Sequence, residues 1–339
     1  MNRMVVSAAV LGIAAGAHAQ ITLDGAADKS YGPAIVVQDT QTQFGDATDG
    51  LPGQCNGSEL DGAFARIEND TLYILLAGNL ESNFNKLEIF LDAVEGGQNQ
   101  LRADNPDVDF NGLNRMGDDL ATKKAVEGLT FDADFSADLW VGLTCGGDPF
   151  AVYMNYAEIL TKGTGFGSYL GTGGAGAKGA AIFKTGFGFG IDNSNIAGVV
   201  GGAEIGDGSG VSTGIEVAIP LSAIPGYMGG DIKVCAFING GGHDFVSNQV
   251  LGGIGGGANL GEPRFVNLDF IPGSQYFVVS AGGTGGGCTG DFDMSGTVDA
   301  SDLAVLLGAW GGSGGDLNGD MVTDASDLAV LLGAWGTCP

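Results

Sequence analysis

Two stretches near the C-terminus carry oxygen-bearing side chains at the alternating spacing of a calcium-binding loop. In each stretch these side chains occupy positions 1, 3, 5, 9 and 12 of the loop, and the residue at position 7 offers its backbone carbonyl. The predicted ligands are Asp291, Asp293, Ser295, Thr297, Asp299 and Asp302 in the first loop, and Asp316, Asn318, Asp320, Val322, Asp324 and Asp327 in the second. Because Ca²⁺ prefers about six to eight oxygen ligands, we predict two calcium sites.

The two loops differ at position 6, where the backbone of such a loop turns into the left-handed region. The first loop has Gly296 there, and the second has Met321. A residue with a Cβ atom adopts this conformation at a cost of roughly 1–2 kcal/mol. We therefore expect the second site to be strained and weaker than the first.

One peptide, DASDLAVLLGAWG, follows the ligands at 299–311 and again at 324–336. Each copy predicts an exit helix, capped by its first aspartate and stopped by Gly311 or Gly336. The leucines and tryptophan of each copy recur at helical spacing and predict one apolar stripe per helix: Leu303, Leu306, Leu307 and Trp310, then Leu328, Leu331, Leu332 and Trp335. Because either short helix would be marginal alone, we expect the two stripes to pack against each other.

A loop followed by a single exit helix, present twice, resembles the dockerin module of bacterial secreted enzymes and scaffolds. The segment 280–290 is too rich in glycine for an entering helix. The resemblance covers about 290–339 and implies calcium-dependent folding and docking onto a cohesin-like or other cell-surface protein. By resemblance, the docking residues are Ala300-Ser301 and Ala325-Ser326, although the 25-residue period is short for the helix that usually connects dockerin repeats.

The cysteines and charges of the segment 288–339 bear on its stability. Cys288 and Cys338 bracket the segment and predict a disulfide worth roughly 3–4 kcal/mol, whereas the pairing of the other cysteines, Cys55, Cys145 and Cys235, stays open. The segment contains eight acidic residues and no Lys or Arg. Because these charges oppose folding of a small core, we expect calcium to supply part of the folding free energy.

The N-terminus predicts export. Arg3, an apolar run to about Ala17 and the sequence Ala17-His18-Ala19 are typical of a secretory signal peptide, here 1–19. The run is shorter than the roughly 20 residues that span a bilayer, and we expect no membrane span. A formal net charge of −27 disfavours binding to nucleic acid or anionic lipid. We therefore predict a secreted, extracellular or cell-surface protein.

The region 20–280 predicts strands throughout. Short apolar or alternating runs occur at 71–78, 86–94, 138–145, 214–221, 231–238 and 275–280, with Gly, Asn and Asp between them. In the segment 163–214, 18 of 52 residues are glycine, which predicts long hairpin loops or a poorly packed insert. The predicted fold class is mainly β: an antiparallel, jelly-roll-like β-sandwich at 20–280, a glycine-rich linker at 281–287 and a small α-helical calcium-loop module at 288–339.

Several sequence segments of this region resemble parts of carbohydrate-binding module 9-like (DOMON-related) sandwich domains. They are ITLDGAADKSYG at 21–32, for an opening strand and Asp-Gly turn, LYILLAGNL and LEIFLD, for a core hairpin, and GIEVAIPLSAI at 214–224, for a late strand and proline turn. The resemblance implies that a carbohydrate ligand would be held between aromatic faces. The single tryptophan of this domain, Trp140, lies within a predicted strand, which favours a core position over a ligand platform.

We predict a non-catalytic binding or attachment protein with a calcium-stabilised tail and a sandwich domain that binds a carbohydrate or matrix ligand. The alternative is a secreted glycan-degrading enzyme or accessory subunit of polysaccharide breakdown, and a third hypothesis is a structural envelope protein. His243, the one histidine after the signal peptide, is predicted to be a loop residue and not a catalytic base. The acidic stretch 107–118 partly matches a calcium loop, but Arg115 at position 9 favours a surface turn.

Overall fold

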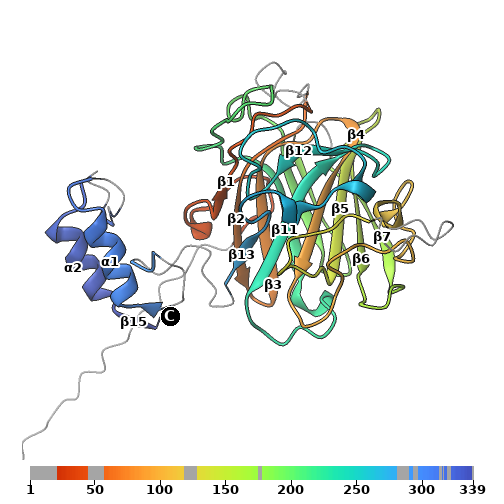
Figure 1. The fold of residues 1–339 in the computed structure, drawn as a ribbon. Helices are drawn as coiled ribbons and strands as arrows, with labels where there is room; N and C mark the ends of the chain where they lie inside the picture. The colour runs from red at the N-terminus through yellow and green to blue at the C-terminus, as the bar shows by residue number, and fades with distance from the viewer. Residues whose placement is uncertain are drawn as a thin grey trace, which may run out of the picture.

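The computed structural model describes residues 21–44, 57–117, 128–174, 178–280, 290–292, 297–312, 315, 317–318 and 322–337. Two antiparallel sheets face each other in a sandwich, and two short helices follow near the C-terminus (Figure 1). The predicted fold class, a mainly β sandwich with a small C-terminal helical region, is confirmed. The predicted signal peptide and the predicted linker lie outside the described residues.

The first sheet has the order β1-β2-β3-β10-β9-β8, and the second has the order β12-β11-β4-β5-β6-β7, with β13 paired to β11. The first sheet contains β1 (Val36–Val37), β2 (Glu59–Glu68), β3 (Thr71–Asn79), β10 (Gly214–Pro220), β9 (Gly188–Asp192) and β8 (Lys178–Ile182). The second contains β12 (Val246–Val250), β11 (Ile232–Asn239), β4 (Asn83–Asp92), β5 (Leu139–Gly146), β6 (Ala151–Glu158), β7 (Gly167–Gly173) and β13 (Phe277–Val279). All six strands predicted from sequence are present, as β3, β4, β5, β10, β11 and β13.

The core between the sheets follows from the two-residue period of the strands. It includes Leu72, Ile74 and Leu76 of β3 and Leu87, Ile89 and Leu91 of β4, all fully buried. The residues between these point to the outer faces. On the outer face of the second sheet, Phe90 and Trp140 form a second core under the loops that carry η3 (Leu113–Met116), η5 (Pro263–Phe265) and η6 (Leu268–Phe270). Side chains on both faces of this sheet are therefore buried.

The glycine-rich segment 163–214 differs from the prediction, because it contains β7, β8 and β9 and contributes Phe187, Phe189 and Ile191 to the core between the sheets. Its glycines permit close packing. A Cβ atom at Gly190 would lie 2.6 Å from the backbone nitrogen of Asp24, so the N-terminal segment crosses directly over β9. The opening strand expected at 21–32 does not form. That segment contains η1 (Lys29–Tyr31) and one isolated bridge, Ala26 to Thr213.

The tail contains α1 (Ala300–Gly308) and α2 (Ala325–Gly333), with a short sheet of β14 (Thr297–Val298) and β15 (Gly336–Thr337). Asp299 and Asp324 cap the helices as predicted, each accepting a hydrogen bond from the backbone two residues on. The helices end three residues before the predicted glycine stops. No helix among the described residues is long and apolar enough to span a membrane.

The predicted single stripe on each tail helix is only partly correct. Leu306 and Leu331 are fully buried, and Leu303 and Leu328 are partly buried against them. Four side chains of the predicted stripes are about half exposed: Leu307, Trp310, Leu332 and Trp335. The reason is geometric. Neighbouring residues such as 306 and 307 lie about 100° apart on a helix, and the tryptophans lie beyond the ends of helices that span only nine residues.

Candidate functional site

A pocket of about 610 Å³ opens on the outer face of the second sheet. It is lined by Phe84, Lys86, Asp109, Phe110, Thr144, Tyr153, Asn155, Tyr169 and Gly241. Strand register builds its floor, because Lys86 of β4 lies opposite Thr144 of β5, which lies opposite Tyr153 of β6. Asn155 lies opposite Tyr169 of β7. Residues from four neighbouring strands thus point into one pocket.

Aromatic side chains form the walls of this pocket. Phe84 sits at an irregularity between β4 and β5, with a φ of 69°, and its ring lies over Gly146. The ring centroids of Phe84 and Tyr153 are 6.3 Å apart. Tyr169 is 52% exposed and Phe110 is 69% exposed. The pocket therefore offers aromatic faces to solvent, whereas its polar floor residues Lys86, Thr144 and Asn155 are buried.

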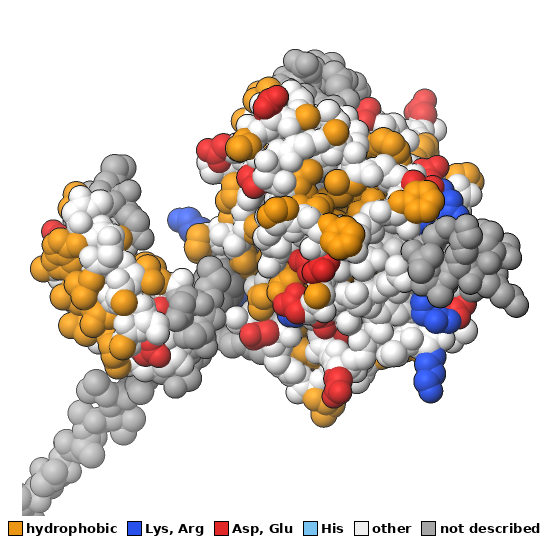
Figure 2. Space-filling view, in the orientation of Figure 1, with side chains coloured by type: hydrophobic (Ala, Val, Ile, Leu, Met, Phe, Trp, Pro, Cys, Tyr) orange, Lys and Arg blue, Asp and Glu red, His pale blue; other side chains and the backbone are white. Residues whose placement is uncertain are grey.

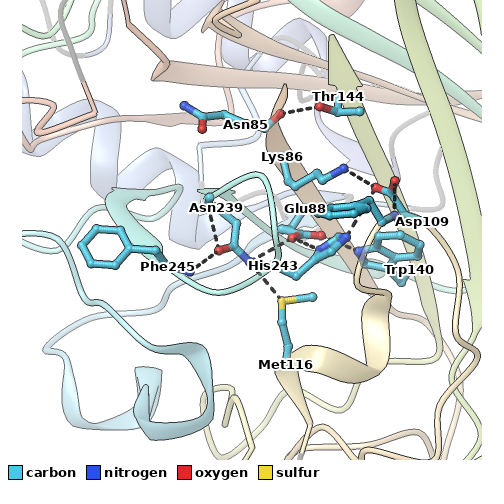
Figure 3. A network of polar contacts seen from close by, with 12 residues as sticks. Asn85, Lys86, Glu88, Asp109, Met116, Trp140, Thr144, Asn239, His243 and Phe245 are labelled. Atoms are coloured by element: carbon cyan, nitrogen blue, oxygen red, sulfur yellow. Dashed lines mark hydrogen bonds and ion pairs between the residues drawn. The ribbon is translucent and has the colours of Figure 1, made fainter. Parts of the chain in front are cut away.

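A chain of four charged groups extends from the pocket floor into the protein (Figure 3). Lys86 Nζ donates to Asp109 Oδ2 at 2.8 Å, and the same oxygen lies 3.4 Å from His243 Nε2. The other ring nitrogen of the histidine, Nδ1, lies 2.7 Å from Glu88 Oε1. Because each ring nitrogen faces a carboxylate, the geometry favours the imidazolium, in which both nitrogens are donors.

Glu88, at the inner end of this chain, is fully buried and accepts two further hydrogen bonds. Asn239 Nδ2 donates to its Oε1 at 3.0 Å, and Trp140 Nε1 donates to its Oε2 at 2.8 Å. The indole reaches this position because it passes over Gly142, where a Cβ atom would lie 2.2 Å from the ring. Trp140 is fully buried, so its predicted core position is confirmed.

The pKa values of His243 and Asp109 follow from opposing effects. Burial lowers the pKa of His243, but the neighbouring carboxylates of Glu88 and Asp109 outweigh it and raise the pKa to about 9. Burial raises the pKa of Asp109, but the adjacent His243 ring and the hydrogen bond from Lys86 outweigh it and lower the pKa to about 2. At neutral pH His243 is therefore positively charged and Asp109 negatively charged.

Backbone strain gathers around the same pocket. Seven non-glycine residues of the described chain have positive φ, and four of them surround this site: Phe84, Asp109, Asn111 and His243. Asn, Asp and His adopt this conformation more readily than most residues, whereas for Phe84 it costs of order 1–3 kcal/mol. Strain of this kind is common at ligand clamps. The strained backbone of Phe84, which lines the pocket, fits such a role.

The tail places several predicted calcium ligands at its two helix starts. Asp291 is 8% exposed, and Asp302 and Asp327 are fully buried. Asp302 accepts hydrogen bonds from the backbone of Phe292 and Asp299, and Asp327 accepts from Leu317, Asn318 and Asp324. Position 12 of each loop is thus folded back onto positions 2 and 9. Thr297 and Val322, at position 7, precede the helices in the two repeats.

Four of the twelve predicted ligands lie outside the described residues: Asp293, Ser295, Asp316 and Asp320. Among the described residues, no group of three or more His, Cys, Asp or Glu side chains is placed to hold a metal ion. The predicted donor set contains carboxylate, hydroxyl, amide and carbonyl oxygens, and the segment 288–339 has no Lys, Arg or His. Such a set suits a hard divalent cation, so the two calcium sites stay a prediction that the chemistry of the residues fits.

The two repeats pair with each other in a near-symmetric way. Val298 pairs with Gly336 in the β14–β15 sheet, and the equivalent Thr323 exchanges backbone hydrogen bonds with Gly311 and Gly312. The start and the end of the tail therefore lie side by side. The predicted disulfide partners Cys288 and Cys338 lie outside the described residues, as does Cys55. Cys145 and Cys235 are buried in different strands of the second sheet.

The site in the sandwich was not predicted from the sequence. His243 is a loop residue as expected, but it is fully buried between two carboxylates. The stretch 107–117 forms a turn and η3, with Asp109 facing Lys86 and Arg115 bound to Glu262 at 2.6 Å. One signal was present in the sequence. Lys86, Glu88 and Phe90 occupy every second position of β4 and therefore share its outer face, so two charged residues lie beside a large apolar one.

Comparison of the chain with protein-family models, with curated proteins and with solved structures finds no match. The resemblances to dockerin modules and to carbohydrate-binding module 9-like sandwiches therefore stay hypotheses.

Proposed function

We propose that this protein is an exported, non-catalytic binding protein, whose sandwich binds carbohydrate in the aromatic pocket and whose calcium-folded tail attaches it to a partner outside the cell. The observation that supports carbohydrate binding is the pocket itself. Aromatic rings of Phe84, Tyr153 and Tyr169 surround a floor that carries an amide, a hydroxyl and a charged pair. Apolar walls with a few fixed polar groups are the usual construction of a small-molecule site.

Sugar rings match this construction because they have apolar C–H faces and hydroxyl edges. Exposed aromatic faces stack against the former. Buried side chains such as Thr144 and Asn155 offer hydrogen-bonding groups to the latter, and strand register holds them in place. The position of the aromatic residues at the mouth and of the polar residues at the floor supports binding of a sugar unit that enters edge first.

Titration calorimetry of the mature protein against glycans that bind on an array tests this proposal. We expect Tyr169→Ala to weaken binding about tenfold or more, since it removes an aromatic wall. Phe270→Ala is the matched control, because Phe270 is 83% exposed and does not line the pocket. Equal losses in the two variants, or no glycan bound at all, would contradict the proposal.

The tail is proposed to dock onto a cohesin-like or other cell-surface protein. The residues at loop positions 10 and 11, Ala300-Ser301 and Ala325-Ser326, are exposed in both repeats. Apolar side chains gather on the surface of the helices (Figure 2), among them Leu307, Trp310, Leu332 and Trp335. A pull-down from the organism's secreted proteins, with calcium and with chelator, tests the attachment. Capture that does not depend on calcium would contradict the proposed role of the metal.

Experiments on the same protein samples distinguish two alternative functions. Release of reducing sugar from a polysaccharide would favour the secreted glycan-degrading enzyme. Recovery of the protein in the cell-surface fraction, with neither glycan binding nor hydrolysis, would favour a structural envelope protein.

A further inference from the structure

The two charged side chains on the floor of the pocket neutralise each other. This pairing affects which sugars the proposed site can bind. Lys86 and Asp109 are the residues with charged side chains that line the pocket. Their side chains are only 3% and 11% exposed, and they are bound to each other at 2.8 Å. Neither charge is therefore presented to a ligand as a free partner.

The pair is held by the groups behind it. His243 lies between Asp109 and Glu88 and is fully buried, so it bridges the two carboxylates inside the protein (Figure 3). Glu88 in turn is fixed by donors from Asn239 and Trp140. Two cations and two anions alternate along the chain, and their formal charges sum to zero. Moving Lys86 away from Asp109 would leave a poorly compensated buried carboxylate, which is strongly unfavourable.

We propose that the Glu88–His243–Asp109–Lys86 chain determines the specificity of the pocket, and that it selects sugar units without a carboxylate or sulfate group. This inference rests on the proposed function. An anionic sugar could be bound only by drawing Lys86 from Asp109 or by approaching the negative charge of Asp109 directly. Discrimination by such a repulsive element is a common source of specificity. A neutral sugar needs only hydrogen bonds from Thr144, Asn155 and the outer edge of the pair.

The test compares matched neutral and acidic oligosaccharides on the full mature protein at constant ionic strength. The neutral probes are cello-, manno- and laminari-hexaose, and the acidic probe is hexagalacturonate. We expect the protein to prefer a neutral probe by about tenfold or more, equivalent to about 1.4 kcal/mol. Asp109→Asn keeps the shape of the side chain but leaves the chain with a net positive charge. It should shift the ratio of acidic to neutral binding toward the acidic probe by about tenfold.

Tyr169→Ala is the control, because it removes pocket wall without changing charge and should weaken both kinds of probe alike. Thermal unfolding of each variant shows whether it folds. If Asp109→Asn does not fold, Lys86→Gln is the second variant, and its net negative charge should shift the same ratio away from the acidic probe. Tighter binding of hexagalacturonate by the unaltered protein, or a ratio that charge-changing variants leave unmoved, would overturn this inference alone. Binding of neither kind of probe would instead overturn the proposed function.

Discussion

His243 lies in the glycine-rich loop segment GGGHDF, yet its ring is enclosed on both sides by carboxylates. The loop turns inward at this residue, with a φ of 54°. Its imidazolium joins Glu88 of β4 to Asp109 of a separate loop. The residue therefore connects the pocket floor to the second core.

The charge of His243 predicts a loss of stability at high pH. Its pKa in the folded protein, about 9, is above the ordinary value of 6.5. The contribution is thus fully present below about pH 6.5 and is lost as the pH rises through about 9. The shift corresponds to about 3 kcal/mol at most. Urea unfolding of the protein and of His243→Gln between pH 6 and 10 measures this, and parallel pH profiles of the two would contradict it.

Gly142 predicts a second effect at the residue scale. A Cβ atom there would lie 2.2 Å from the Trp140 ring, so Gly142→Ala should displace the indole and break its hydrogen bond to Glu88. Overpacking of this kind costs about 1–3 kcal/mol. We expect a lower unfolding temperature and weaker glycan binding. Gly308→Ala, at a helix position with open space, is the control and should not lower stability. An unchanged unfolding temperature in Gly142→Ala would show that the ring moves freely.

At the scale of elements, adjacent leucines of each tail helix differ in how deeply they are buried. Leu306 and Leu307 are identical neighbours in α1, yet the first is fully buried and the second is 52% exposed. We expect Leu306→Ala to destabilise the tail by about 2–5 kcal/mol and Leu307→Ala by less than about 1 kcal/mol. Amide exchange of α1 and α2 in the full protein measures both. Similar losses of protection would mean that both side chains support the fold, whereas a loss of partner binding in Leu307→Ala alone would support the docking surface.

At the scale of the whole molecule, the sandwich and the tail have separate hydrophobic cores. The sandwich core unites both sheets, whereas the described part of the tail has three fully buried hydrophobic residues, Val298, Leu306 and Leu331. So small a core needs another source of stability, and the proposed metal supplies it. We expect a chelator to abolish the helical signal and amide protection of the tail and to leave the sandwich transition unchanged. Identical tail protection with and without chelator would contradict the calcium assignment.

The ligand frame of the tail makes a related prediction. Asp302 is a buried carboxylate at position 12, whereas Thr297 at position 7 should contribute through its backbone carbonyl. Asp302→Ala should therefore weaken calcium binding at the first loop more than Thr297→Ala does. Calorimetry with calcium measures the difference. Equal effects of the two substitutions would show that the residues have been assigned to the wrong loop positions.

The sequence by itself determined the strands with strong alternation, the two tail helices and their aspartate caps, because each of these depends on residues close together in the chain. It also indicated that Trp140 belongs to a core. It did not reveal β7 to β9, although Gly188 and Gly190 of β9 permit close packing against the N-terminal segment, nor which leucine of each tail helix is buried. The pocket was decided only by the tertiary structure. Glu88 and His243 are 155 positions apart, and only strand register and loop packing place them within 2.7 Å. Charges that far apart carry no local pattern, since their stabilisation exists only once the fold has removed them from water and set them against each other.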